Sequence, residues 1–409
     1  MLGGLGLGLK QKRKTSTDFY MPPPSSSMID RSRLRYGVLA LLVFITVMSL
    51  STLNTSLRST PSFRVPPPPS TSQLAIAWEH LPDRFELGFV ADLDKASKVS
   101  DSKKPLFQSY FQKAILQRHD RPDTSSVADS SAAAQFEYSV TWKDMATFST
   151  TLNEAGRGFE LSELAWFQGQ LHSFDDRTGL VFRLDHFSMR DGPNDMRAVP
   201  VAIAMEGNGE TTKGQKHEWA TVKDGELFMG SIGKEFTAGA QVIHENNMWV
   251  SILSHNGAVR HENWTDRFRK VREAVGCGYP GYVIHEAIEW SAVHRQWFVL
   301  PRRVSTEVYD DVADEKRGSN LLIVASEDFT HVEVRKVGTI TPERGFSSFK
   351  FVPGTHDSVI VALKSMENDA TDAQAAYVTV FTVDGAVLMP ETALPGTFKY
   401  EGVAFLHDY

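Results

Sequence analysis

The chain has 409 residues, of which 41% are hydrophobic and 23% charged, a balance typical of a globular protein with one large domain or two ordinary ones. Its formal net charge is −7, and because residues 1–35 carry seven basic and two acidic side chains, the remainder carries −12. An acidic body argues against nucleic-acid binding through phosphate contacts and is compatible with a bound cation.

Three segments precede the predicted folded body. Residues 1–35 are expected to form a basic, disordered cytosolic tail. Residues 36–53, "YGVLALLVFITVMSLSTL", hold no charge and approach the ~20 residues that cross a bilayer as a helix. Three arginines just before them mark the cytosolic side. Residues 54–80 contain a stalk rich in proline and serine.

This order predicts a single-pass type II protein of the ER or Golgi membrane, with residues 36–53 as an uncleaved signal anchor and the body in the lumen. A cleaved signal peptide, which would leave a secreted form, is the alternative. The single cysteine, Cys277, excludes an intrachain disulfide and is expected to be a buried thiol.

Residues 81–409 are expected to form the folded domain. Residues 105–117 fit a short helix or a strand, and "NWTDRFRKVREAVG" (263–276) fits a helix that ends at glycine. The rest shows short apolar runs separated by turn residues, which predicts an all-β fold.

Five segments of the body resemble one another. We call the first residue of each the head residue. The segments are "SELAWFQGQLHSFDDRTG", "EWATVKDGELFMGSIGKE", "EAIEWSAVHRQWFVLPRR", "SSFKFVPGTHDSVIVALKS" and "EGVAFLHDY", with head residues Ser162, Glu218, Glu286, Ser347 and Glu401. Successive heads are 56, 68, 61 and 54 residues apart, which fits four-stranded propeller blades of roughly 40–50 residues with added loops.

The two ends of the body complete the repeat. The last segment has a first strand, and the chain ends soon after it. "FELGFVADLD" (85–94) begins the body and resembles the second strands of the other segments. The sequence therefore predicts a five-bladed β-propeller that is closed by pairing of its N-terminal and C-terminal strands.

Equivalent positions on the innermost strands of such a ring point toward its axis. The five heads would place three carboxylates and two hydroxyls there, and carboxylates so close repel unless a cation lies between them. Oxygen ligands without His or Cys suit Ca²⁺. Glu163, beside Ser162, would add another oxygen. The simpler interpretation of each Glu is a solvated strand end.

The second strands would end at the same mouth of the ring, where polar residues gather. Asp92 and Asp176 occupy matching points of neighbouring blades, so we expect them to activate a water molecule. Arg302 would face phosphate oxygens. The remaining candidates are substrate contacts from Asp94, Asp175 and Arg177. Base stacking on Trp219 is a further candidate, although packing is the default role of that side chain. A rim of ordinary salt bridges is the alternative to this predicted hydrolysis of a phosphoanhydride.

Several motifs in order resemble the soluble calcium-activated nucleotidase (apyrase) family: "FVADLD", "GRGFELSEL", "DDRTG", "KHEWATVKD", "GYVIHE", "FVLPRR", "GFSSFKF" and "KYEGVAF". The resemblance covers about residues 85–407. It implies a five-bladed propeller with a central Ca²⁺ that hydrolyses nucleoside di- and triphosphates, with UDP and GDP favoured.

Residue by residue, the resemblance implies calcium ligation by the five heads and essential roles for Asp92 and Asp176. Arg157 and Arg302 lie in motifs that also match. Glu163 stands where the vertebrate relative has Asp, and Ala155 where it has Lys.

Two other functions fit the same ring. One is a non-enzymatic calcium propeller that binds a partner at its mouth. The other is a calcium-dependent lactonase or esterase, although such sites usually include Asn and His ligands, which no head provides. The sequence also leaves a homodimer open.

Overall fold

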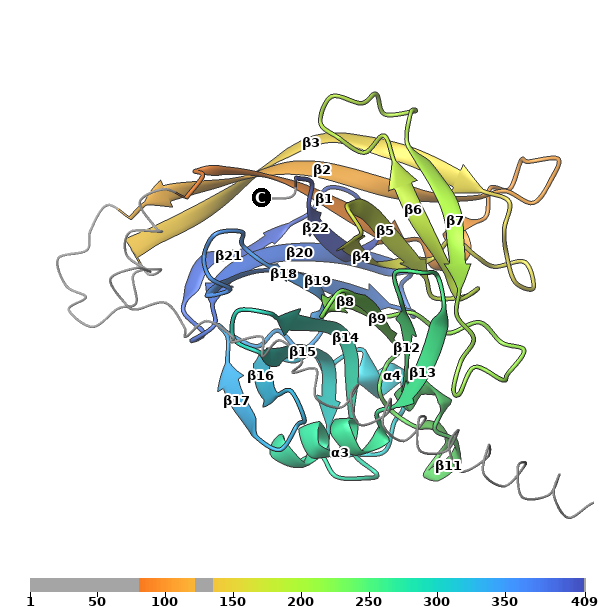
Figure 1. Cartoon of the computed structure of the whole chain (residues 1–409), viewed down its shortest axis with the longest axis vertical. Helices are drawn as coiled ribbons and strands as arrows, with labels where there is room; N and C mark the ends of the chain where they lie inside the picture. Colours follow the sequence, from red (N-terminus) through yellow and green to blue (C-terminus); the bar gives the residue numbers. More distant parts are fainter. Residues whose placement is uncertain (1–80, 122–134, 408–409) are drawn as a thin grey trace, which may run out of the picture. The chain divides into compact units, whose positions relative to one another are not determined.

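In a computed structural model of the chain, residues 81–121 and 135–407 are described (Figure 1). The tail, membrane helix and stalk expected over residues 1–80 lie outside these residues. The described body is built of strands, with one 10-residue helix, α3 (Thr265–Ala274), where the sequence predicted it. Residues 107–120 form strand β2, which settles the helix-or-strand alternative for that segment.

Five four-stranded antiparallel sheets form the blades of a propeller, as predicted (Figure 1). The innermost strands of four blades are β4 (Leu161–Phe167), β8 (Trp219–Lys223), β14 (Tyr282–Ser291) and β18 (Gly345–Phe351). The blade of β4 continues outward with β5 (Gln170–Asp175), β6 (Leu180–Asp185) and β7 (Arg197–Ile203), and the blade of β8 with β9 (Glu226–Gly230), β12 (Trp249–Leu253) and β13 (Val259–Asn263). The blade of β14 continues with β15 (Gln296–Ser305), β16 (Leu321–Ser326) and β17 (Val332–Lys336). The blade of β18 continues with β19 (Val359–Asn368), β20 (Ala373–Thr382) and β21 (Val387–Ala393). A hairpin of β10 (Phe236–Ala238) and β11 (Gln241–His244) and the short helix α4 (Asp311–Asp314) lie between blade strands in the sequence.

The fifth blade joins the two ends of the domain, as predicted. Its strand order is β22 (Lys399–Phe405), β1 (Arg84–Asp92), β2 (Phe107–Asp120) and β3 (Phe136–Thr150). β22 pairs antiparallel with β1 from Leu87 opposite Phe405 to Asp92 opposite Lys399. The innermost strands then contact one another in the ring order β22, β4, β8, β14, β18 and back to β22.

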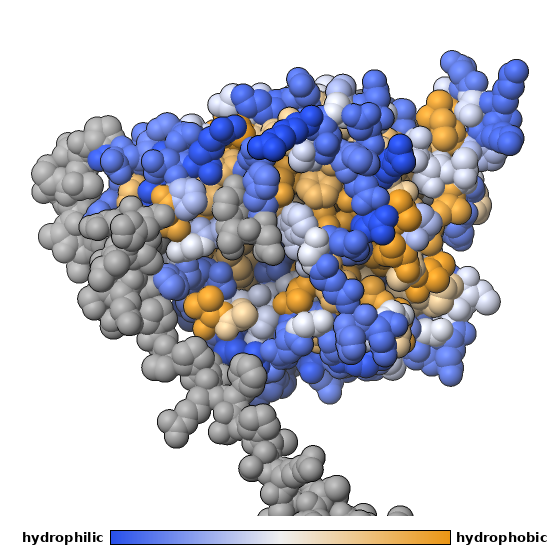
Figure 2. Space-filling view, turned by 45° about the horizontal axis from the view of Figure 1, so that its top comes forward, coloured by the Kyte–Doolittle hydropathy of each residue, from blue (hydrophilic) through white to orange (hydrophobic). Residues whose placement is uncertain are grey.

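Local sequence explains the hairpins between first and second strands. In the turn between β8 and β9, Asp224 and Gly225 both have positive φ, 51° and 82°. Such a two-residue turn follows the right-handed twist of the strands, and Asp-Gly favours it. Apolar residues alternate along the strands and pack between neighbouring blades in five buried clusters. In the view of Figure 2, hydrophilic residues cover most of the described surface, and hydrophobic residues show mainly between them.

One sequence-based expectation is wrong. No helix among the described residues is long and apolar enough to cross a membrane, which contradicts the predicted single-pass membrane protein. The longest described helix, α3, has 10 residues and would span about 15 Å, against about 30 Å for the hydrocarbon core of a bilayer.

Gly402 in β22 lies where the last inner strand closely approaches the neighbouring inner strand β4. A Cβ added there would lie 2.7 Å from the carbonyl carbon of Glu163 and 2.8 Å from the backbone nitrogen of Leu164, both in the neighbouring β4. Gly402→Ala is therefore expected to lower the free energy of unfolding by about 1–3 kcal/mol in a urea titration.

Gly278→Ala is the matched control, because a Cβ there meets no atom within 4 Å. It is expected to leave the unfolding midpoint unchanged or slightly raised. Equal midpoints for the two variants would contradict the close contact of the first and last inner strands.

Candidate active site

Four of the five head residues lie where the ladder between the first and second strands of their blade is interrupted. The interruptions fall at Ser162 and Glu163 in β4, Glu286 in β14, Ser347 in β18 and Glu401 in β22. Glu218 immediately precedes β8, and its backbone nitrogen donates to the carbonyl of Gly230 at 2.8 Å. A β-bulge leaves its extra residue unpaired and re-aims the side chain. The bulges therefore explain how strands that otherwise pack against neighbouring blades present polar groups at the axis.

The three head carboxylates are buried close together. Glu218, Glu286 and Glu401 are each at most 7% exposed. Burial raises the pKa of Glu218 and Glu286, the latter to about 7, and the nearby Lys216 and Arg302 offset only part of this effect. Burial also opposes ionisation of Glu401, but Lys399 and Arg302 outweigh it and lower its pKa. The structure thus confirms a cluster of acids that needs compensating positive charge.

Three basic side chains lie between these acids. Lys216 Nζ contacts Glu218 and lies 2.7 Å from Asp176 Oδ2. Arg302 bridges Glu286 and Glu401, with 2.8 Å to the Glu401 carboxylate, and its other nitrogen lies 2.8 Å from Glu367. Lys399 Nζ lies within 3.0–3.6 Å of Asp92, Asp94, Glu367 and Glu401.

The sequence analysis did not identify Lys216, Lys399 or Glu367 as site residues. A signal for the two lysines was present, because each lies two residues before a Glu head. In the structure Lys216 Nζ contacts Glu218 and Lys399 Nζ lies 3.6 Å from Glu401, so the shared spacing goes with a shared contact. Glu367 lies near the end of β19, without such a regularity to mark it.

Asp92 and Asp176 lie at the ends of second strands, at the same mouth. Asp92 ends β1 and is 2% exposed; burial raises its pKa, Lys399 opposes this, and Asp176 is among the acids that raise it further. Asp176 directly follows β5 and is 8% exposed. Its Oδ1 is buried and has no hydrogen-bond partner among the described residues. Asp176 therefore keeps an oxygen free to accept a proton.

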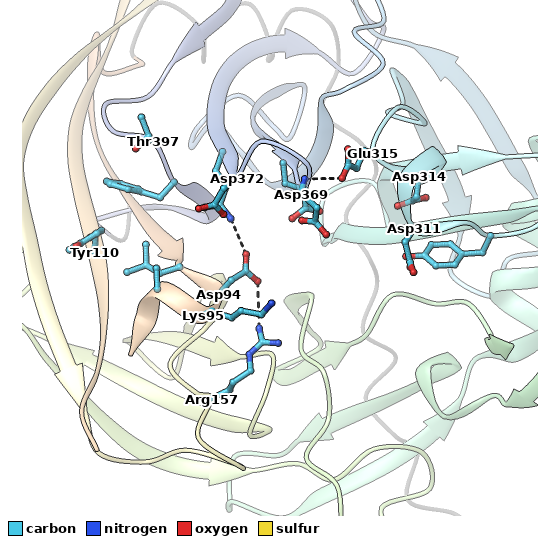
Figure 3. A pocket seen from close by; sticks show the side chains of 16 residues that line it. Asp94, Lys95, Tyr110, Arg157, Asp311, Asp314, Glu315, Asp369, Asp372 and Thr397 are labelled. Carbon is cyan, nitrogen blue, oxygen red and sulfur yellow. Dashed lines mark hydrogen bonds and ion pairs between the residues drawn. The ribbon is translucent and has the colours of Figure 1, made fainter. Parts of the chain in front are cut away.

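A cavity of about 890 Å³ opens at this mouth (Figure 3). Arg157 and Asp94 line it, with 3.7 Å between Arg157 Nη2 and Asp94 Oδ1. Arg157 also binds the fully buried Glu160, which lies two residues before the head of β4 and was not predicted. The volume is within the range of small-molecule sites.

Seven carboxylates and two basic side chains line the cavity. The acids are Asp94, Asp311, Asp314, Glu315, Glu367, Asp369 and Asp372, and the bases are Lys95 and Arg157. In Figure 3, Arg157 and Asp94 lie on one side, while Asp311, Asp314 and Glu315 lie on another.

Three of the suggested substrate contacts have other partners. The Asp175 carboxylate accepts from the backbone nitrogens of Phe159 and Arg177 and from Thr178 Oγ1 at 2.8–3.0 Å. Arg177 Nη2 lies 3.9 Å from Glu154. Trp219 is fully buried and donates to the Ser231 carbonyl at 3.1 Å, which fits its packing interpretation.

Glu163 belongs to a second polar layer of the axis. Its Oε1 accepts from Ser348 Oγ at 2.7 Å and lies 3.3 Å from Lys350 Nζ, which also binds Glu289. Lys350 and Glu289 each follow a head by three residues. Burial raises the pKa of Glu163 to about 8, with partial relief from Lys350.

The oxygens at the axis fit a hard cation. Ser162 Oγ, Asp176 Oδ1 and Glu163 Oε2 are buried and have no hydrogen-bond partner among the described residues. Buried polar atoms are normally bonded, so unpartnered oxygens beside crowded carboxylates mark where a cation would be favourable. An all-oxygen set of this kind suits Ca²⁺. At the same mouth, carboxylate oxygens of Asp92, Asp94 and Glu160 lie within 4.8 Å of one another.

The chain is similar in sequence to proteins of a known family. A family model described as Apyrase matches residues 93–406. "Soluble calcium-activated nucleotidase 1" of Rattus norvegicus is 42% identical over 79% of this chain and 74% of its own. "Apyrase apy-1" of Caenorhabditis elegans is 42% identical over 78% and 84%, and "Apyrase" of Cimex lectularius is 38% identical over 80% and 84%. The name of the rat protein calls that relative soluble.

The buried bridge at Arg302 makes a pH-dependent prediction. Arg302→Met would leave Glu286 and Glu401 buried without this cation, so we expect about 3 kcal/mol of lost unfolding free energy at pH 8 in urea with a chelator. Arg302 and Lys399 lower the pKa of Glu401, so the stabilisation exists above the unfolded pKa near 4.5 and is lost as the pH falls through the folded value.

The difference in unfolding free energy between Arg302→Met and the parent protein should therefore be smaller at pH 4 than at pH 8. Arg260→Met is the control, because the exposed Arg260 pairs with Glu226 at the surface and should contribute less than about 1 kcal/mol. If Arg302→Met loses the same unfolding free energy at pH 8 and at pH 4, the stabilisation does not come from the ion pairs of Arg302 with Glu286 and Glu401.

Proposed function

The chain belongs to the apyrase family, enzymes that hydrolyse nucleotide phosphates, and on this premise we propose that it cleaves nucleoside di- and triphosphates to monophosphate and phosphate with Ca²⁺ bound. UDP and GDP are the proposed favoured substrates. The observation that carries the proposal is the convergence of buried, partly unpartnered carboxylates and basic side chains at one mouth of the propeller. Family membership sets aside the alternative of a non-enzymatic propeller.

The proposed calcium ligands are the oxygens of Ser162, Glu218, Glu286, Ser347 and Glu401. A Ca²⁺ ion held there would supply positive charge for the phosphate oxygens. Glu163 lies in the second polar layer, where it pairs with Lys350. We propose that it contributes to the same calcium site indirectly. The rat relative's name, which includes calcium activation, supports this cofactor.

Asp176 is the proposed base. Lys216 Nζ lies 2.7 Å from Oδ2, while the unpartnered Oδ1 can accept a proton from the attacking water. Asp92 would help to position that water from the neighbouring blade. The water oxygen bonds to the terminal phosphorus, the bond to the bridging oxygen breaks, and the monophosphate departs with that oxygen.

Arginines would neutralise the phosphates. Arg157 lines the cavity and is partly exposed, so it can turn toward a substrate. Arg302 is already bonded to three carboxylates, and we therefore propose that it acts by holding Glu286 and Glu401 in place. Asp94, which also lines the cavity, is the best placed of the four suggested substrate contacts.

Phosphate release from UDP by the full chain tests the proposal. We expect release with Ca²⁺ present and a loss of at least about tenfold after EGTA, because the head carboxylates would otherwise repel the substrate. Equal release in both conditions would refute the calcium requirement.

Asp176→Asn should separate turnover from binding. The amide keeps the shape but is a poor proton acceptor, so kcat should fall by about 10²–10⁴, while UDP still protects the protein in a thermal-shift assay. Unchanged kcat would exclude Asp176 as the base.

Glu218→Ala should cost calcium affinity more than folding. Loss of one ligand should reduce the stabilisation of the protein by added Ca²⁺, measured as the shift in Tm with calcium concentration. In EGTA, the same variant should unfold close to the parent Tm, since the mutation also removes one of the mutually repelling acids. The opposite pattern would mean that Glu218 supports the fold and not the metal.

A further inference from the structure

Tyr309 forms an aromatic wall of the cavity that also contains Arg157. Lys234 Nζ lies 4.4 Å from the centre of the Tyr309 ring, over one face, and donates to the Glu235 carbonyl at 2.8 Å. Tyr282 packs against the same ring at 5.3 Å in an edge-to-face arrangement. The ring is thus held in place by a cation on one face and by the edge-to-face contact with Tyr282.

The polar groups next to this ring are carboxylates. Asp311 makes a side-chain hydrogen bond with Tyr309, and Asp314 accepts from the Tyr282 hydroxyl. Asp311 and Asp314 both line the cavity on the same side in Figure 3. Asp311 is exposed and has no salt bridge within the described residues, so one of its oxygens is available to a ligand. An ionised carboxylate can only accept hydrogen bonds.

We propose that Tyr309 is the platform on which the nucleobase of the substrate stacks, and that Asp311 reads the Watson–Crick edge of that base. This inference rests on the proposed function and deepens it, because it assigns residues to a base-binding subsite. With Arg157 and Tyr309 lining one cavity, the phosphates and the base of a single nucleotide can occupy it together.

The chemistry of Asp311 selects between two classes of base. Uracil, guanine and hypoxanthine carry an N–H group in the middle of the Watson–Crick edge, whereas adenine and cytosine carry a ring nitrogen with a lone pair there. A carboxylate accepts from the first class and repels the second. A site built to pair with such an N–H rejects the analogue that lacks it, because a desolvated acceptor is left unpaired.

The other aromatic group of the cavity is the pair Tyr110 and Phe398. These rings pack against each other at 4.9 Å, and Phe398 also packs against Tyr400 at 5.3 Å. Both rings are thus already packed against other aromatic rings. Tyr110 and Thr397 lie across the cavity from Asp311 in Figure 3, so a base bound there would not reach Asp311.

Substrate pairs that differ only at this N–H provide the test. With the full chain and saturating Ca²⁺, kcat/KM for UDP should exceed that for 3-methyl-UDP and for CDP by about tenfold or more. IDP should match GDP within a few-fold, since both carry the N1–H. Asp311→Asn should reduce the UDP/CDP ratio about tenfold, because an amide can also donate to the cytosine ring nitrogen.

Asp372→Asn is the matched control. Asp372 lines the same cavity and is exposed, but lies apart from Asp311 (Figure 3), so its removal should leave the UDP/CDP ratio within twofold. Tyr309→Ala should raise KM for UDP at least about tenfold with kcat within a few-fold, and Tyr309→Phe, which keeps the ring, should restore most of the affinity.

Three results would overturn the inference. They are equal kcat/KM for UDP and 3-methyl-UDP, an unchanged UDP/CDP ratio in Asp311→Asn, or a base preference that disappears in Tyr110→Ala and survives in Tyr309→Ala. These results leave nucleotide hydrolysis itself intact. Failure of the unmodified protein to release phosphate from any nucleotide would instead refute the proposed function.

Discussion

Carboxylates that are buried together at one axis must have positive charge beside them, and the rest of the site depends on this constraint. Glu218, Glu286 and Glu401 come from three different blades and share the space around the axis. Lys216 and Arg302 neutralise part of their charge from within the chain. The compensation is incomplete, because burial still raises the pKa of Glu218 and Glu286. The remaining negative potential is what a divalent cation would satisfy.

Ring closure and the bulges bring these acids together. A propeller blade normally directs its side chains toward the neighbouring blades, where they form the apolar clusters. Interrupted ladders at Ser162, Glu286, Ser347 and Glu401 free individual residues from that packing. Pairing of β22 with β1 then fixes the position of Glu401, which is contributed by the last strand of the domain. The closed ring therefore supports both the stability of the domain and the integrity of the site.

The cavity divides into two electrostatic regions. Near the axis, Asp92, Asp94 and Glu367 are matched by Lys399, Arg157 and Arg302. Farther out, Asp311, Asp369 and Asp372 are exposed on the rim. A polyanionic substrate would therefore meet complementary charge at the inner end, while Asp311 on the rim would accept hydrogen bonds from a donor group. This separation would orient the proposed substrate, with its phosphates at the inner end and its base at the rim.

The repeated pattern in the sequence was sufficient to predict the five blades, their closure and the five heads. Period-two alternation, turn residues and evenly spaced heads depend on local backbone geometry, so a single sequence records them. The membrane location inferred from residues 36–53 was wrong, since no helix among the described residues is long and apolar enough to cross a bilayer. Lys216 and Lys399 could have been found from their spacing to the heads, and Arg157, singled out only because its motif matches the family, lines the cavity.

Other features were decided only by the tertiary structure. Which cation neutralises which acid depends on strands from different blades meeting, as when Arg302 of β15 reaches Glu401 of β22, 99 residues away. The placement of Glu163 with Lys350 and the backing of Tyr309 by Lys234 likewise join residues far apart in the chain. The sequence determined the kind of groups at the axis because each is fixed by its position along one strand. Their partners were decided by closure of the ring, because only closure sets the distances between blades.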